Sequence, residues 1–80
     1  EKREMKLRQL VISDKGQFIG KTLSESGIRD IYDCMVVGME KGEETLSMLS
    51  PSHQFQKEDT IWVVGEKEKL ERLMEANNKK

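Results

Sequence analysis

The sequence predicts an α+β domain with the order β-α-β-β-β-α, in which two helices accompany a four-stranded, mostly antiparallel sheet. Three observations support this prediction. Four short segments are rich in strand-forming residues and are bounded by turn residues. Two other segments carry apolar residues at helical spacing. The length of 80 residues suits one domain over 1–80, for which we expect an ordered core over about 5–76.

The first predicted strand spans residues 5–12, after a charged lead-in. Residues 13–16 have the composition of a turn. A short connector over 17–21 follows, and it contains two large apolar side chains. We expect Phe18 and Ile19 to reach the core, because burying their apolar surface stabilises the fold.

A helix is predicted from Thr22 to Asp33. Thr22 and Glu25 have the spacing of a capping box, which marks a helix start. Gly27 falls inside this segment and costs about 1 kcal/mol relative to Ala, so we expect a bend or a close contact there. The predicted apolar face consists of residues that recur at roughly helical spacing: Leu23, Ile28, Ile31 and Tyr32.

The helix leads directly into a second strand over 34–39, which is predicted to pair with a third strand over 45–49. The polar segment 40–44 between them predicts a hairpin tip, in which Gly42 suits a positive φ. Pro51 ends the third strand, because proline cannot donate to a strand ladder.

The last part of the chain contains a loop, a strand and a helix. Residues 53–59 form a polar loop with one apolar anchor, Phe55. The most strand-like segment follows over 60–65. A second helix is predicted over 66–77, and residues 77–80 are expected to fray into solvent.

Composition excludes several classes of protein. The net charge is −1 without a basic stripe, and aromatic residues make up 5%, which argues against a nucleic-acid partner. The sequence has no apolar run of the ~18 residues that a membrane span needs. A single cysteine excludes an internal disulfide and favours a reducing compartment, so we expect a cytoplasmic location. A core this small favours oligomerisation or attachment to a larger protein.

Few residues suggest chemistry. His53 lacks a neighbouring Cys or His, so we expect a solvated side chain and no metal site. Cys34 opens an apolar strand, which favours a buried structural thiol over a nucleophile. Arg29 has two interpretations: its guanidinium clamps a phosphate or carboxylate, or it pairs on the surface with a neighbouring acid. The acidic residues of the hairpin, Glu40, Glu43 and Glu44, are expected to be solvated.

An ordered series of segments resembles the TrkA-C domain, the C-terminal regulatory subdomain of RCK proteins (regulators of K⁺ conductance). The resemblance extends from about Leu7 to Leu73. It implies the β-α-β-β-β-α fold, a homodimer, and a non-enzymatic ligand-sensing role on the cytoplasmic side of K⁺ channels, K⁺ uptake systems or cation/proton antiporters. The segments that carry it are 7–13, 18–23, 26–29, 36–38, Pro51, 59–65 and the closing helix.

Two departures from the family pattern limit the cofactors that the resemblance implies. The nucleotide-binding Rossmann half is not in this sequence, so no NAD or ATP site is expected. Some members bind cyclic di-AMP between two subunits through a pattern of residues. In chain order the pattern is an aliphatic residue, an Asp, an Arg, an Asn with an aliphatic residue next to it, and a later Pro. Gly27 stands at the Asp position and Met35 at the Asn position, so we expect weak or no cyclic di-AMP binding. The candidate ligand site is Leu23, Arg29, Met35, Val36 and Pro51.

The function we expect is that of a ligand-sensing regulatory domain of a membrane monovalent-cation transporter for K⁺ or Na⁺/H⁺. The alternative is a purely structural dimerisation module of the same transporter that binds no ligand. The expected partners are a second copy of the chain, the membrane region of the same protein and a small anionic or nucleotide ligand. We expect the dimer to bury apolar side chains of the strands, namely Met35, Met39, Met48 and Trp62.

Overall fold

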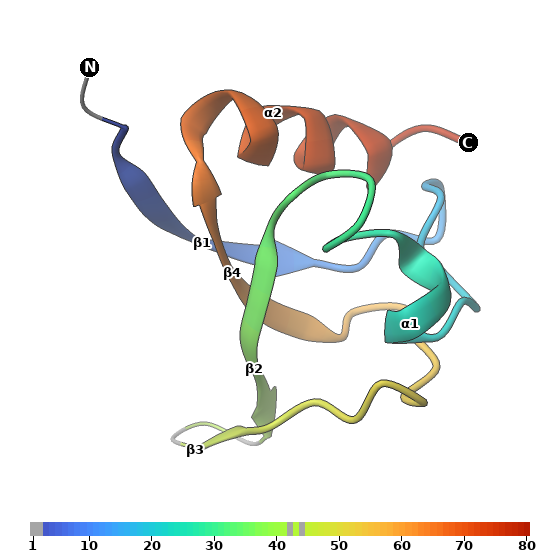
Figure 1. Ribbon diagram of the computed structural model, residues 1–80. Coiled ribbons are helices and arrows are strands. Elements are labelled where there is room, and N and C mark those ends of the chain that lie inside the picture. Colours follow the sequence, from blue (N-terminus) through green and yellow to red (C-terminus); the bar gives the residue numbers. More distant parts are fainter. Residues whose placement is uncertain (1–2, 42, 44) are drawn as a thin grey trace.

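The computed structural model describes residues 3–41, 43 and 45–80. The element order is the predicted one, and the α+β fold is confirmed (Figure 1). Gly42, for which the sequence favours a positive φ, lies outside the described residues. The elements are β1 (Met5–Val11), α1 (Leu23–Ser26), β2 (Met35–Lys41), β3 (Thr45–Ser47), β4 (Thr60–Glu66) and α2 (Lys67–Ala76).

The four strands form one antiparallel sheet in the order β1-β4-β2-β3. β4 pairs with β1 on one side and β2 on the other. Its side chains alternate between the two faces of the sheet, so that Ile61 and Val63 are fully buried whereas Trp62 and Val64 are half-buried. β2 pairs with β4 through a register shift between Val36 and Gly38, which is a bulge. β3 is shorter than predicted and ends at Ser47, so Met48 lies outside it.

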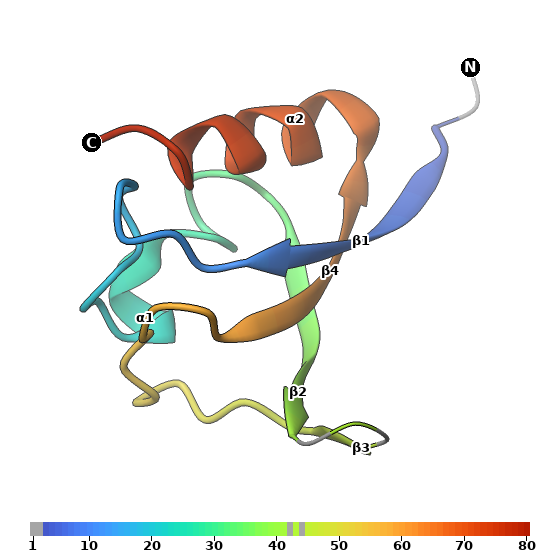
Figure 2. The ribbon, with the colours of Figure 1, turned by 180° about the vertical axis from the view of Figure 1, so that it is seen from behind.

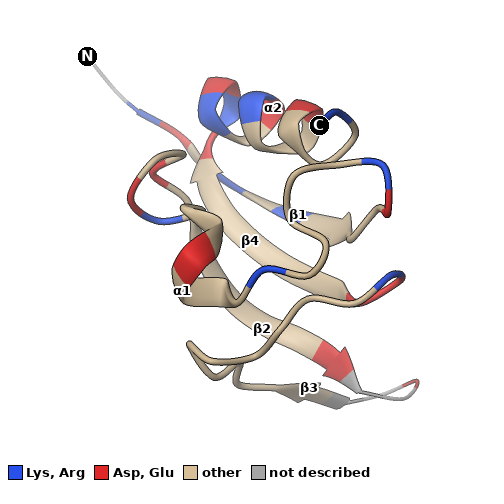
Figure 3. Cartoon of the chain, turned by 90° about the vertical axis from the view of Figure 1, so that its right-hand side faces the viewer, with Lys and Arg blue, Asp and Glu red and all other residues tan. Residues whose placement is uncertain are grey.

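The core lies between one face of the sheet and a cover of helix and loops. Figures 2 and 3 show that α2 and α1, with the loops connected to α1, lie on the same side of the sheet. α2 packs against β1 and β4 and buries Leu70, Leu73 and Ala76. Phe18 and Phe55 are buried as predicted, and each comes from a loop on the covered face. No helix in the described ranges is long and apolar enough to cross a bilayer.

The first helix is much shorter than predicted. It ends after one turn at Ser26, because Gly27 adopts the left-handed conformation (φ 76°) that terminates helices. The carbonyl of Gly27 then accepts the N–H groups of Ile31 and Tyr32 in a turn. Ile28 is buried but Ile31 is 65% exposed, so the helical spacing of these residues was misleading.

The C-terminal segment is also more ordered than predicted. Asn77 does not fray but is 3% exposed. Its amide nitrogen donates to the carbonyl of Val11 (2.8 Å), and its amide oxygen accepts the N–H of Ser13 (3.1 Å). Asn77 therefore joins the end of α2 to the end of β1 and replaces the ladder partners that β1 loses there.

The capping box generates a prediction about stability. Thr22 Oγ1 accepts the N–H of Glu25 (3.1 Å), and Glu25 Oε1 accepts the N–H of Thr22 (3.0 Å). Thr22→Ala is expected to lower the free energy of unfolding by about 1 kcal/mol, with the fold retained. Chemical denaturation measures this, and Ser24→Ala, an exposed change in the same turn, is the matched control. Equal stability of wild type and Thr22→Ala would mean that the cap does not hold the helix.

The same capping box predicts a contribution to the free energy of unfolding that is lost in acid. The hydrogen bonds from Thr22 lower the pKa of Glu25 below its ordinary value of 4.5. Glu25 therefore contributes stability that is complete above the unfolded-state pKa and is lost as the pH falls through the lowered folded-state pKa. The stability difference between wild type and Glu25→Gln, which keeps an acceptor, should shrink in denaturation series below pH 4.5. A difference that stayed constant into strong acid would contradict this.

Candidate functional site

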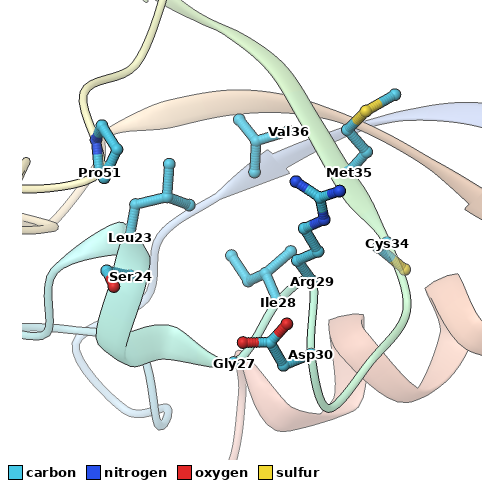
Figure 4. Close-up of a pocket in the computed structure, with 10 residues that line it drawn as sticks. All are labelled: Leu23, Ser24, Gly27, Ile28, Arg29, Asp30, Cys34, Met35, Val36 and Pro51. Carbon is cyan, nitrogen blue, oxygen red and sulfur yellow. The ribbon is translucent and has the colours of Figure 1, made fainter.

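All of the predicted site residues line one pocket with a volume of about 560 Å³ (Figure 4). They come from two parts of the chain. Residues 23–36 run from α1 (Leu23) through the following loop (Arg29) to the start of β2 (Met35 and Val36), and the loop after β3 carries Pro51. The structure therefore brings together the residues that the sequence singled out. Further lining residues, which sequence reasoning did not include, are Ser24, Gly27, Ile28, Asp30 and Cys34.

The α1 wall of the pocket is a single helical turn, and each of its four N–H groups donates a hydrogen bond to the cap residue or to the loop after β3. Such a turn is not stable alone, because helix nucleation is unfavourable. Two of its donors use the loop after β3 as acceptor: Leu23 N–H to the carbonyl of His53 (2.9 Å) and Ser24 N–H to that of Pro51 (3.0 Å). The other two, from Glu25 and Ser26, are accepted by Thr22. The position of Leu23 thus depends on the loop that carries Pro51.

Arg29 supplies the positive charge of the pocket. Its side chain is exposed, and Figure 4 shows the guanidinium extending toward Met35 and Val36. Among the ion pairs of the described residues none involves Arg29, so the pairing with a neighbouring acid is not seen there. Asp30 also lines the pocket, and Figure 4 shows its carboxylate apart from the guanidinium of Arg29. The pocket lining therefore carries one positive and one negative side chain, which point to different parts of the pocket.

The loop that carries Arg29 is tied to α2. Asp33 takes a positive φ of 57° and accepts a hydrogen bond from Lys69 Nζ at 2.9 Å. This hydrogen bond holds the pKa of the Asp33 carboxyl below its ordinary value. Within the loop, the N–H of Cys34 donates to the carbonyl of Ile28 (3.0 Å) and closes the turn, so that Arg29 and Met35 directly follow the two joined residues.

β2 supplies the remaining wall. Met35 is 55% exposed, and Val36 packs partly against the core. Cys34 is buried and its Sγ donates to the carbonyl of Tyr32 (3.4 Å). Burial raises the pKa of the Cys34 thiol, which keeps it protonated and poorly nucleophilic near neutral pH. The prediction of a buried structural thiol is confirmed.

His53 is not the solvated residue that the sequence suggested. Its Nε2 lies 2.8 Å from Asp59 Oδ2, and its ring meets that of Phe55 edge to face with centroids 5.8 Å apart. A local pattern could not reveal this contact, because the two residues are in an irregular loop. No group of three or more possible metal-binding side chains occurs in the described ranges.

Glu40 is also placed differently from the prediction. It belongs to β2 and is half-buried, not solvated at a hairpin tip. Its Oε2 accepts hydrogen bonds from Trp62 Nε1 (2.9 Å) and Gln9 Nε2 (2.7 Å). This contact links three neighbouring strands and lies outside the pocket.

The fold is shared with solved RCK structures. The GsuK RCK domain aligns with a TM-score of 0.79 and 21% identity, covering 94% of this chain and 16% of that one. The RCK_C domain dimer of S. agalactiae BusR in complex with c-di-AMP gives 0.74 and 19%, covering 90% and 89%. BusR in complex with its busAB-promotor DNA gives the same score and identity, covering 90% and 35%.

Sequence comparison identifies the family. Potassium channel protein 1 of Methanocaldococcus jannaschii is 30% identical over 70 residues, which is 88% of this chain and 21% of that protein. The chain thus spans about a fifth of the relative's length. Residues 7–77 match the TrkA-C domain. Because this match covers nearly all of the sequence and agrees with the fold, the chain belongs to the TrkA-C domain family.

Proposed function

We propose that this domain is a non-catalytic regulatory module on the cytoplasmic side of a membrane transporter for K⁺ or Na⁺/H⁺, and that it responds to a small anionic or nucleotide ligand. The observation that carries the proposal is the pocket. Its lining gathers Leu23, Arg29 and Pro51 from separate segments, together with Met35 and Val36. The name of the archaeal relative supports a host that transports K⁺.

The lining suits a ligand with a charged group and an apolar body. A guanidinium presents several donors in one plane, which matches phosphate or carboxylate oxygens. The same lining contains the apolar side chains of Leu23 and Val36, which favour a flat ring or a hydrocarbon surface. A phosphorylated nucleoside combines both features. Asp30 would repel an anion at its own side of the pocket, so we place the anionic group near β2.

Cyclic di-AMP is a weak candidate for this ligand. The BusR domain with the same fold was solved in complex with it. In this chain, a thioether at Met35 stands where the family resemblance implies an amide, and a thioether accepts hydrogen bonds only weakly. Gly27 supplies no carboxylate at the other departing position. Each lost hydrogen bond to a charged group weakens the binding free energy by roughly 1.5–3 kcal/mol.

We propose that two copies of the domain pair beside the pocket. Several large apolar side chains are open to solvent: Met35, which lines the pocket, is 55% exposed, Ile31 65% and Met48 93%. The BusR RCK_C domain is a dimer. Two copies related by an axis near Arg29 would bring two guanidiniums together, which is unfavourable when empty and favourable around an anion. Met39 belongs to the core and not to this surface, and Trp62 is half-buried against Glu40.

The alternative function is a structural dimerisation module that binds no ligand. The exposed apolar side chains of Ile31, Met35 and Met48 favour pairing whether or not the pocket is occupied. The acidic Asp30 in the lining is consistent with an unused pocket. Ligand titration distinguishes the two functions, because only the sensing module binds an anion through Arg29.

The ligand proposal is tested by calorimetry and by NMR titration with cyclic di-AMP, 5′-AMP and pyrophosphate. We expect weak or no heat with cyclic di-AMP, and shifts at the amides of Leu23 and Val36 with at least one of the other anions. Arg29→Ala should remove these shifts, whereas Arg8→Ala, an exposed arginine on β1, should keep them. Submicromolar cyclic di-AMP binding that survived Arg29→Ala would contradict both the ligand and the site.

The assembly proposal is tested by light scattering. We expect a dimer at high micromolar concentration, because pairing removes exposed apolar surface from water. Met48→Lys should weaken the dimer, whereas Met74→Lys, at a less exposed methionine of α2, should leave it intact. A monomer at high micromolar concentration would argue against pairing.

A further inference from the structure

Two side chains of opposite charge line the pocket, and they are neighbours in the chain. Arg29 and Asp30 are both exposed, and both belong to the loop that joins α1 to β2. Figure 4 shows the guanidinium and the carboxylate extending to different parts of the pocket. No ion pair among the described residues involves either side chain. The carboxylate of Asp30 is therefore available to a ligand, as the guanidinium of Arg29 is.

The backbone that carries these two residues is held on both sides. Ile28, which precedes them, is buried in the core. The carbonyl of Gly27 accepts the N–H groups of Ile31 (2.7 Å) and Tyr32 (3.1 Å), which follow them. Asp30 therefore projects from a backbone that is ordered before a ligand arrives, and a contact to it loses little free energy to the ordering of the loop.

The hydrogen-bonding capacity of a carboxylate defines the group that suits Asp30. A carboxylate only accepts hydrogen bonds, and its two oxygens can accept two parallel N–H donors. Among the common nucleobases only guanine offers two adjacent donors on one edge, with its ring N1–H beside its 2-amino group. Adenine and cytosine place an acceptor nitrogen beside the amino group, and uracil flanks its N–H with two carbonyls. Each of these three bases would set an acceptor against the carboxylate.

We propose that Asp30 makes the pocket selective for a guanine nucleotide, which places its base edge at Asp30 and its phosphate at Arg29. This inference rests on the proposed function, in which the pocket takes an anionic ligand through Arg29. A nucleotide carries its phosphate and its base on opposite sides of the sugar, and the pocket carries its two charges in different parts. A volume of about 560 Å³ lies in the range of sites for ligands of this size.

The same carboxylate disfavours ligands that carry only negative charge. A bare anion such as pyrophosphate meets repulsion from Asp30 in the pocket that attracts it to Arg29. A guanine nucleotide matches both charges, because its phosphate oxygens accept from the guanidinium while its base donates to the carboxylate. The two neighbouring residues therefore combine an attractive and a repulsive element, which together produce specificity.

Calorimetric and NMR titrations of the 80-residue chain with 5′-GMP and 5′-IMP test the proposal. The two nucleotides differ only in the 2-amino group of the base, which 5′-IMP lacks. We expect 5′-GMP to bind about tenfold more tightly, because 5′-IMP loses a hydrogen bond to a charged acceptor. 5′-AMP, which has an acceptor nitrogen beside its amino group, should bind no more tightly than 5′-IMP.

Two variants assign this preference to one carboxylate. Asp30→Asn, which keeps the shape of the side chain but not its charge, should reduce the preference for 5′-GMP over 5′-IMP to about twofold. Pyrophosphate should bind this variant at least as tightly as the wild type. Asp14→Asn is the matched control, because it removes the same charge from an exposed aspartate outside the pocket lining, and it should keep the full preference.

The outcomes separate this inference from the proposed function. Equal affinities of the wild type for 5′-GMP and 5′-IMP, or a preference that survives Asp30→Asn, would overturn the inference and leave anion binding at Arg29 in place. If no nucleotide and no pyrophosphate bound in a manner that Arg29→Ala removes, the proposed function would fail, and the inference would fall with it.

Discussion

The side of the domain that contains the pocket depends on α1, a single helical turn that is not stable in isolation. α1 has four N–H groups, and all four are accepted from outside the helical ladder or by its cap, Thr22. Two of the acceptors are carbonyls of the loop after β3, which is about thirty residues away in sequence. Because an isolated turn is unstable, these bonds join two distant segments into one unit. The pocket lies where this unit meets β2.

Gly27 determines how the chain leaves α1 and lines the pocket. Its left-handed backbone ends α1 and turns the chain outward, so that Ile28 enters the core while Arg29 remains exposed at the pocket. A Cβ at this position would lie 2.6 Å from Ile31 Cδ1, and a side chain would also disfavour the positive φ. The same glycine therefore shapes the turn and leaves the pocket without the carboxylate that the family resemblance implies there.

Membership of the TrkA-C family and the geometry of the pocket address different questions. The match over residues 7–77 identifies the domain and agrees with its fold. The lining of the pocket bears on ligand chemistry: one guanidinium, one carboxylate and several apolar side chains. The His53–Asp59 contact lies in the loop after β3, which also carries Pro51 of the lining. A regulatory domain of this kind can differ from its relatives in ligand while it keeps their fold.

Local patterns in the sequence determined the strands, the capping box, the buried Phe18, Phe55 and Cys34, and the residues that gather at the pocket. These features follow from alternation, spacing and side-chain chemistry within a few neighbours, or from the ordered resemblance. Only the tertiary structure decided where α1 ends, because Gly27 suits either a helix interior or a C-cap until its φ is known. It also decided the partners of Asn77, Glu40 and His53. Their contacts join irregular segments or separate strands, and a linear pattern carries no signal for such pairs.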